Sequence, residues 1–176
     1  MNNILCSFFS KSRRIMVQLA LVCTVASPVA VCSVYAAETA VAATHVPANL
    51  KVGDNYGGGK VAYLFQSGDE GYVAGQTHGL ISAKEDQASN TTWDKAVKAC
   101  QQFKGGGFSD WRLPNKAELN RLYVSRAAIG GFKDHHFYWS STESDKNDAW
   151  DQSFRTGVQN LGYKLDNNYV RAVRTF

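Results

Sequence analysis

The segment WRLPNKAELNRLY, residues 111–123, contains the clearest helix start in the chain. Asn115 follows Pro114, and Glu118 comes three residues later, which is the spacing of an N-terminal capping box. The apolar residues that follow recur at helical spacing and are Leu119, Leu122 and Tyr123. The segment therefore predicts a helix that starts at Asn115 and buries one face.

A second helix is predicted upstream of this segment. Thr91 and Asp94 have a spacing near that of a capping box, and Gly105-Gly106-Gly107 ends the helical pattern. The expected buried face consists of Trp93, Ala96, Val97, Cys100 and Phe103. Cys100 is therefore interpreted as a small buried apolar residue rather than as a reactive thiol.

Short strands are predicted on both sides of the two helices. Apolar runs next to turn residues indicate strands at 61–65, 71–75, 79–83, 137–139, 150–154 and 169–176. Gly57-Gly58-Gly59-Lys60 is interpreted as a turn, because Val61 stands where a phosphate-binding loop has Ser or Thr. The large side chains expected in the core are Trp93, Trp111 and Trp139. Two helices among short strands predict an α+β domain.

The first 36 residues differ from the rest of the chain in having three basic residues and no acidic one. Lys11, Arg13 and Arg14 precede an apolar run, and the run ends at Ala36, a small residue of the kind that precedes a cleavage site. An uncleaved membrane anchor is the alternative, but Pro28 interrupts the run. The predicted organisation is a signal peptide at 1–36, a linker at 37–49 and a ligand-binding domain at 50–176.

Export would place the protein in the periplasm, at the cell surface or outside the cell. Cys6, Cys23 and Cys32 lie in the leader, so the mature chain is expected to fold without an internal disulfide. The remaining 140 residues carry 16 Lys and Arg against 15 Asp and Glu. This near-neutral balance excludes a strongly basic nucleic-acid-binding domain, and no membrane span is expected after cleavage.

Four sequence blocks occur in a fixed order: WRLP (111–114), YWSSTE (138–143), AW (149–150) and VRAVR (170–174). With the glycine-rich segment 52–59 and the segment 78–86, they resemble the C-terminal domain family of the Legionella collagen-like protein over about residues 50–176. The resemblance implies a C-type-lectin-like fold, related also to formylglycine-generating enzymes, with two helices packed on short irregular antiparallel sheets. For the named family member it implies adhesion through sulfated glycosaminoglycans. The chain lacks that protein's collagen-like glycine repeats.

The sequence predicts neither catalysis nor a cofactor. Formylglycine-generating enzymes hold copper with paired thiols, which a single mature cysteine cannot supply. His45 and His78 are isolated in the sequence, and His135 and His136 are adjacent. This spacing does not favour a metal cluster. Ser140 and Ser141 have no acid or base at a spacing that selects either as a nucleophile.

An acidic stretch from Glu143 to Asp151 raises the possibility of a calcium site. Its oxygen donors are Glu143, Asp145, Asn147, Asp148 and Asp151. The stretch lacks the glycine and terminal glutamate of an EF-hand and the ligand triplets of calcium-dependent C-type lectins. A solvated acidic turn is therefore the preferred interpretation, with calcium binding as the alternative.

Exposed cations and amides in the turn-rich segment are the candidate ligand-binding groups. Arg171 and Arg174 would face opposite sides of one strand, and Arg112 is assigned an internal hydrogen-bonding or cation–π role. The predicted ligand-binding residues are Lys146, Trp150, Arg155, Asn160, Lys164, Asn167 and Asn168. The leading hypothesis is a secreted, non-catalytic domain that binds polysaccharide or sulfated glycosaminoglycan in adhesion. The alternative is a cell-envelope protein–protein interaction module that binds an envelope or host-surface protein and no glycan.

Overall fold

The helix predicted from residue 115 is present as α2 (Lys116–Val124), and both halves of its capping box are formed. Asn115 Oδ1 accepts the backbone N–H of Glu118 at 2.8 Å, and Glu118 Oε2 accepts the backbone N–H of Asn115 at 2.8 Å. The computed structural model describes residues 46–176. The predicted signal peptide and residues 37–45 of the predicted linker lie outside the described residues.

The upstream helix, α1 (Trp93–Gln102), is confirmed, but the predicted Thr91–Asp94 cap is wrong. The helix begins after Thr92, whose side chain makes no capping hydrogen bond. Thr91 instead ends the strand β4 (Ala88–Thr91), and its carbonyl accepts the indole N–H of Trp139 at 2.9 Å. Two further short helices were not predicted: the 3-10 helix η1 (Gly105–Gly107) and α3 (Arg126–Ile129).

A four-stranded antiparallel sheet forms one part of the domain. Its strands, in spatial order, are β1 (Asn55–Tyr56), β2 (Gly59–Leu64), β3 (Gly79–Ser82) and β9 (Val173–Thr175). Gly57 and Gly58, both at positive φ, form the turn between β1 and β2, so the turn interpretation of the glycine run is confirmed. The strand predicted at 71–75 is wrong, because Gly71 and Gly75 also have positive φ and the segment is an exposed turn region.

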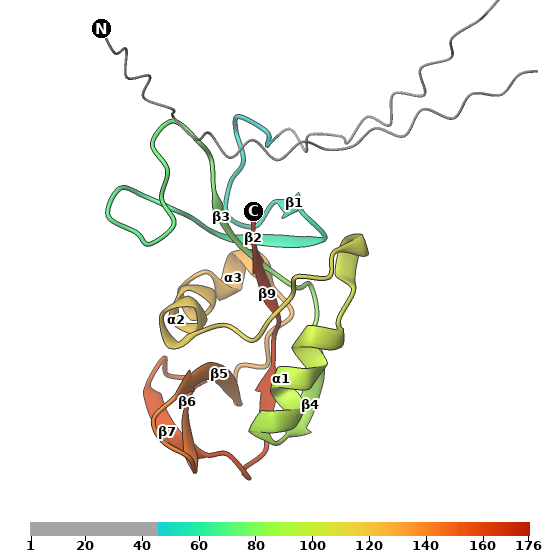
Figure 1. Ribbon diagram of the computed structural model, residues 1–176, viewed down its shortest axis with the longest axis vertical. Coiled ribbons are helices and arrows are strands. Elements are labelled where there is room, and N and C mark those ends of the chain that lie inside the picture. The colour runs from blue at the N-terminus through green and yellow to red at the C-terminus, as the bar shows by residue number, and fades with distance from the viewer. Residues whose placement is uncertain (1–45) are drawn as a thin grey trace, which may run out of the picture. The chain divides into compact units, whose positions relative to one another are not determined.

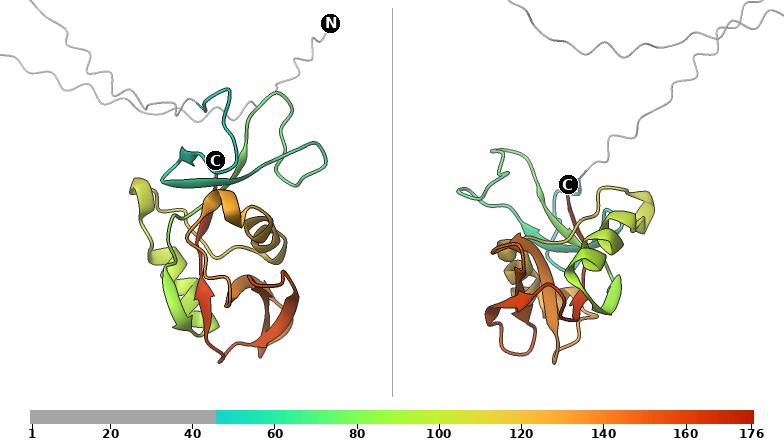
Figure 2. Two further views of the ribbon diagram at one scale, coloured as in Figure 1. Left: turned by 180° about the vertical axis from the view of Figure 1, so that it is seen from behind. Right: turned by 60° about the horizontal axis from the view of Figure 1, so that its bottom comes forward.

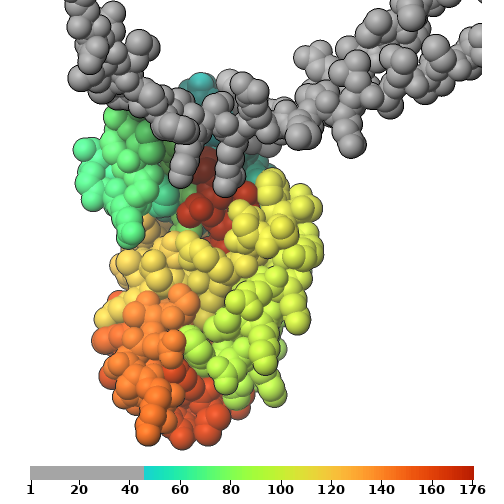
Figure 3. Space-filling model, viewed as in Figure 1, coloured from blue at the N-terminus to red at the C-terminus, as the bar shows by residue number. Residues whose placement is uncertain are grey.

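A five-stranded mixed sheet forms the other part of the domain. Its order is β4, β8 (Asn168–Val170), β5 (Phe137–Glu143), β6 (Asp148–Ser153) and β7 (Gln159–Tyr163). The sheet is not wholly antiparallel as predicted, because β5 and β8 pair in parallel. Figure 1 shows β5, β6 and β7 together at one end of the domain, and the same orange segment is exposed in the space-filling view (Figure 3).

The strand predicted at 169–176 is instead divided between the two sheets. β8 and β9 are separated by Arg171 and Ala172, and the Ala172 carbonyl accepts the N–H of Ala83 at 2.9 Å. Arg171 turns into the interior, where Nε lies 2.8 Å from Asp86 Oδ1 and the guanidinium also reaches backbone carbonyls. The C-terminal segment therefore links the sheets (Figure 1), and neither Arg171 nor Arg174 is a surface cation.

Two apolar clusters form on opposite sides of the strands β3 and β5. Neighbouring residues alternate between the clusters: Ile81 and Trp139 face the cluster of α1, whereas Leu80 and Tyr138 face the cluster of α2 and α3. Figure 2 shows α1 and α2 on opposite sides of the C-terminal segment. Burial on both faces explains why the β3 run is continuously apolar rather than alternating.

The predicted core residues are largely confirmed. Trp111 and Trp139 are buried, and Trp93 is partly buried against the same cluster. Cys100 is fully buried in α1, and burial raises the pKa of its thiol to about 12. The thiolate form is therefore disfavoured, which fits a packing role. No helix among residues 46–176 is long and apolar enough to cross a membrane.

Candidate functional site

The seven predicted ligand-binding residues do not form one site, because they are distributed over both ends and both faces of β6 and β7. Lys146 occupies the turn between β5 and β6, and this turn meets the segment after β7 through a 2.8 Å bond from the Lys164 N–H to the Asn147 carbonyl. Asn167 is exposed at the same end. Arg155 lies in the turn between β6 and β7, at the other end of these strands.

Two of the predicted residues have internal structural partners. Lys164 is only 13 % exposed at its side chain, and its ammonium donates to Glu143 and to the carbonyls of Asp145 and Lys146. Asn168 is buried and donates to Asp151 Oδ2 at 2.9 Å. The expectation that Lys164 is a well-exposed cation is wrong, because folding closes the acidic turn around it.

The acidic stretch does not gather its carboxylates around a common point. Glu143 pairs with Lys164, and Asp145 accepts the backbone N–H groups of Asn147 and Asp148, which lower the pKa of its carboxyl. Asp151 faces the interior. In the part of the chain that the structure describes, no group of three or more His, Cys, Asp or Glu side chains could hold a metal ion.

Arg155 borders a hollow of about 640 Å³ between α3, the segment 130–135 and the β6–β7 turn. Arg126 and His135 also line this hollow, and Asp134 is the one acidic residue among the lining residues. Phe132 and Phe154 add apolar surface. Arg126 is held in place by a 2.8 Å bond to the Tyr123 carbonyl and by stacking 4.0 Å above the Tyr123 ring. Among the described residues, no hydrogen bond or ion pair engages the Arg155 guanidinium. We call this region the arginine hollow.

Trp150 belongs to a separate surface on the side of β6 and β7 that carries α2. Leu161 lies directly opposite Trp150, and Tyr163 lies opposite Asp148, so these side chains share one face of the hairpin. Leu161 and Tyr163 are about half exposed, at 51 % and 48 %. The Lys116 ammonium lies 2.9 Å from the centroid of the partly buried Trp150 ring. We call Trp150, Leu161, Tyr163 and Lys116 the tryptophan face.

Asn160 lies between Gln159 and Leu161 on β7 and therefore faces the other side of the sheet from Trp150. Arg126, Lys116, Leu161 and Tyr163 were not predicted as site residues. The alternation of Leu161, Gly162 and Tyr163 is a weak strand signal, and it could have identified Leu161 and Tyr163 as neighbours on one face. Nothing in the local sequence associates Arg126 with Arg155.

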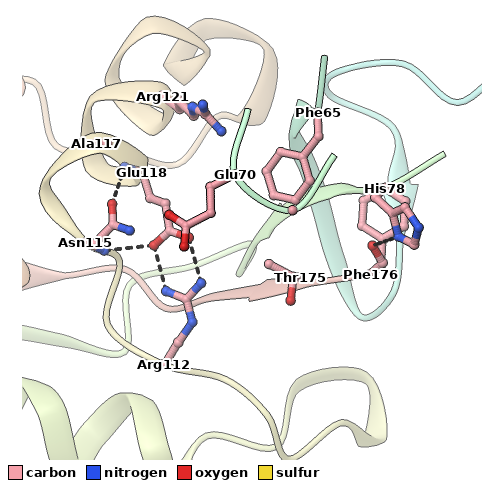
Figure 4. A pocket seen from close by; sticks show the side chains of 11 residues that line it. Phe65, Glu70, His78, Arg112, Asn115, Ala117, Glu118, Arg121, Thr175 and Phe176 are labelled. Carbon is pink, nitrogen blue, oxygen red and sulfur yellow. Dashed lines mark hydrogen bonds and ion pairs between the residues drawn. The ribbon is translucent and has the colours of Figure 1, made fainter. Parts of the chain in front are cut away.

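A second hollow, of about 520 Å³, lies between the segment 65–78, α2 and the C-terminal strand (Figure 4). Arg112 donates to both carboxylate oxygens of Glu118 at 2.6 Å, which confirms the internal hydrogen-bonding role predicted for it. Burial raises the pKa of the Glu118 carboxyl, but the bonds from Arg112 and the Asn115 N–H outweigh it and lower the pKa overall. Charge is thus largely balanced within this hollow.

Possible catalytic groups are separated from one another. Ser140 is buried, and its hydroxyl oxygen accepts the N–H of Thr142 at 3.2 Å. His136 stacks on Tyr169 at a centroid distance of 4.4 Å, whereas its neighbour His135 lines the arginine hollow. His78 bonds to Gln76 and to the Phe176 carbonyl. These four groups therefore belong to separate surroundings.

Comparison with known proteins gives one family. The model of the Lcl C-terminal domain matches residues 71–174, which include α1, α2 and every strand of the five-stranded sheet. No curated protein matches the chain.

Proposed function

We propose that this chain, which belongs to the Lcl C-terminal domain family, is an exported, non-catalytic domain that binds polysaccharide. The preferred ligands are sulfated glycosaminoglycans or other anionic glycans, and the role is adhesion. A C-type-lectin-like arrangement, with α1 and α2 packed beside short irregular sheets, is part of the proposal.

The observation that carries the proposal is the uncompensated positive charge of the arginine hollow. Two arginines, Arg126 and Arg155, line this hollow, whereas Asp134 is the one acidic residue among its lining residues. A guanidinium presents several N–H donors in a plane and binds sulfate or carboxylate in bidentate fashion. Because Arg155 has no partner among the described residues, a bound anion would not have to displace one.

The tryptophan face supports the same function by a different kind of contact. Sugar rings have apolar faces that pack on aromatic and aliphatic side chains, and Tyr163 and Leu161 offer such surface to solvent. Lys116 adds a cation next to Trp150. A glycan could therefore use ring packing at one end of the hairpin and charge-assisted hydrogen bonds at the other.

The test is a glycan array with protein purified from cells that express the full chain, at low and raised salt. Sulfated glycans are expected to bind best, and binding should weaken with salt because exposed charges are screened. Arg155→Ala should weaken binding about tenfold or more, the effect of losing a charge-assisted hydrogen bond. Lys98→Ala removes the same charge from the exposed surface of α1 and should have little effect.

The variant Arg155→Lys distinguishes the effect of the positive charge from that of the bidentate hydrogen-bonding geometry. A lysine keeps the charge but not the bidentate fork, so its affinity should fall between those of the wild type and Arg155→Ala. Equal losses in Arg155→Ala and Lys98→Ala would contradict the assignment of the arginine hollow. A blank array with folded protein would contradict glycan binding and favour the protein-interaction alternative.

A further inference from the structure

β7 is the outermost strand of the five-stranded sheet and, among the described strands, pairs only with β6 (Figure 1). Unpaired edges recruit other strands, and most proteins protect them with charged residues, proline, or a covering helix. The other edge strand, β4, is short and packs against α1. β7 lacks the first two of these protections, because the stretch Thr156–Tyr163 contains no charged residue and no proline.

The register of β6 and β7 identifies which backbone groups face the free edge. The N–H of Ser153 donates to the Val158 carbonyl, and the N–H of Lys164 donates to the Asn147 carbonyl. In an antiparallel ladder, bonded and non-bonded pairs alternate, so Gln159, Leu161 and Tyr163 direct their backbone groups outward.

The outward groups of Tyr163 already have partners in the turn that follows. Its N–H donates to Asp166 Oδ2 at 3.2 Å, and its carbonyl accepts the N–H of Asp166 at 2.7 Å. Among the described residues, the backbone groups of Gln159 and Leu161 have no such partner. The side chains of Val158 and Leu161, 54 % and 51 % exposed, add apolar surface beside this edge.

We infer that the occupant of this edge is β7 of a second copy of the chain, paired in antiparallel fashion about a two-fold axis at Asn160. Gln159 of one copy then pairs with Leu161 of the other, and the reverse, which gives about four backbone hydrogen bonds. Charge repulsion does not oppose this self-pairing, because Thr156–Tyr163 contains no charged residue. A two-fold pair also closes, so it leaves no further edge exposed at β7.

The geometry of this pair has a consequence for ligand binding, which rests on the function proposed above. The two-fold axis runs perpendicular to the sheet, so the tryptophan faces of both copies lie on the same side of the joined sheets. A long polysaccharide could then contact both copies, and the second contact would be intramolecular. The dimer would thereby supply multivalent adhesion without collagen-like repeats.

The test is the mass of the purified full chain by sedimentation velocity as a function of concentration, without glycan. The wild type is expected to shift from monomer to dimer. Leu161→Pro removes an outward backbone N–H that bonds to no described group. Edge strands tolerate proline at such a position, so the variant should fold but should not shift from monomer to dimer. Leu161→Lys places two like charges near the axis and should raise the dissociation constant at least about tenfold.

The matched control is Val124→Lys, which adds the same charge at a 70 % exposed position on α2 and should leave the dimer unchanged. A wild type that stays monomeric up to about 1 mM would overturn the inference and assign the edge to another partner. Dimers that persist in both Leu161 variants would overturn it as well. Because no glycan is present, this result is independent of the glycan array.

Discussion

The most informative stability prediction concerns Asp151, whose side chain is buried beneath β7. Only 6 % of the residue is exposed, and Oδ1 has no hydrogen-bond partner among the described residues. Asn168 donates to Oδ2 at 2.9 Å, which is the one bond that the carboxyl makes within residues 46–176. Burial raises the pKa of Asp151 from 3.8 to about 6, and the nearby charge of Asp166 adds to the increase.

The raised pKa sets both the sign and the size of the pH dependence. The folded state holds its proton more tightly than the unfolded state, so the contribution of Asp151 to stability is greatest below about pH 4. This contribution falls as the pH rises through about 6, because the charged form is then buried. A shift from 3.8 to about 6 corresponds to about 3 kcal/mol of unfolding free energy.

The perturbation is Asp151→Asn, compared with the wild type by urea unfolding between about pH 4 and pH 8. Asn cannot ionise, and its amide oxygen can still accept the bond from Asn168. The free energy of unfolding of the variant minus that of the wild type should therefore rise by about 2 to 3 kcal/mol across this range. Constant costs of the substitution cancel, since they do not depend on pH. A difference that stays flat from pH 4 to pH 8 would refute the reasoning.

Two further predictions test buried charge and helix capping. Arg171→Met should lower the free energy of unfolding by about 3 kcal/mol, because it removes a fully buried guanidinium and leaves the partly buried Asp86 carboxylate without its cation, and urea unfolding would measure the loss. A loss below about 1 kcal/mol would show that the pair is dispensable. Asn115→Ala should cost about 1 kcal/mol through loss of the capping box, whereas Thr92→Ala, at a cap without a side-chain bond, should cost less by the same assay.

The features predicted correctly from sequence are those that neighbouring residues determine. The start of α2 follows from Asn115 and Glu118, which bond to each other across one turn. The strand β3 follows from its continuous apolar run, which reflects burial on both faces. The burial of Cys100 follows from its helical spacing relative to the other apolar residues of α1. In each case, the signal and the structure lie within a few residues of each other.

The features missed depend on contacts between distant segments. Arg171 interrupts the last strand because its guanidinium reaches carbonyls 40 and 88 residues away in sequence, a pairing that no local pattern encodes. Lys164 loses its exposure because Glu143 lies beside it after folding. Arg126 and Arg155 line one hollow only when α3 packs near the β6–β7 turn. The chemistry of the site was thus partly predictable, but its location was not.

The division of the C-terminal segment between two sheets also governs when this domain can fold. β8 is an interior strand between β4 and β5, and β9 pairs with β3 across more than ninety residues of sequence. Val170 and Val173 contribute to different apolar clusters, so both clusters are incomplete until residues 168–175 have been synthesised. The domain therefore cannot complete its fold before residues 168–175 have been synthesised, and the distant strand pairings make folding slow.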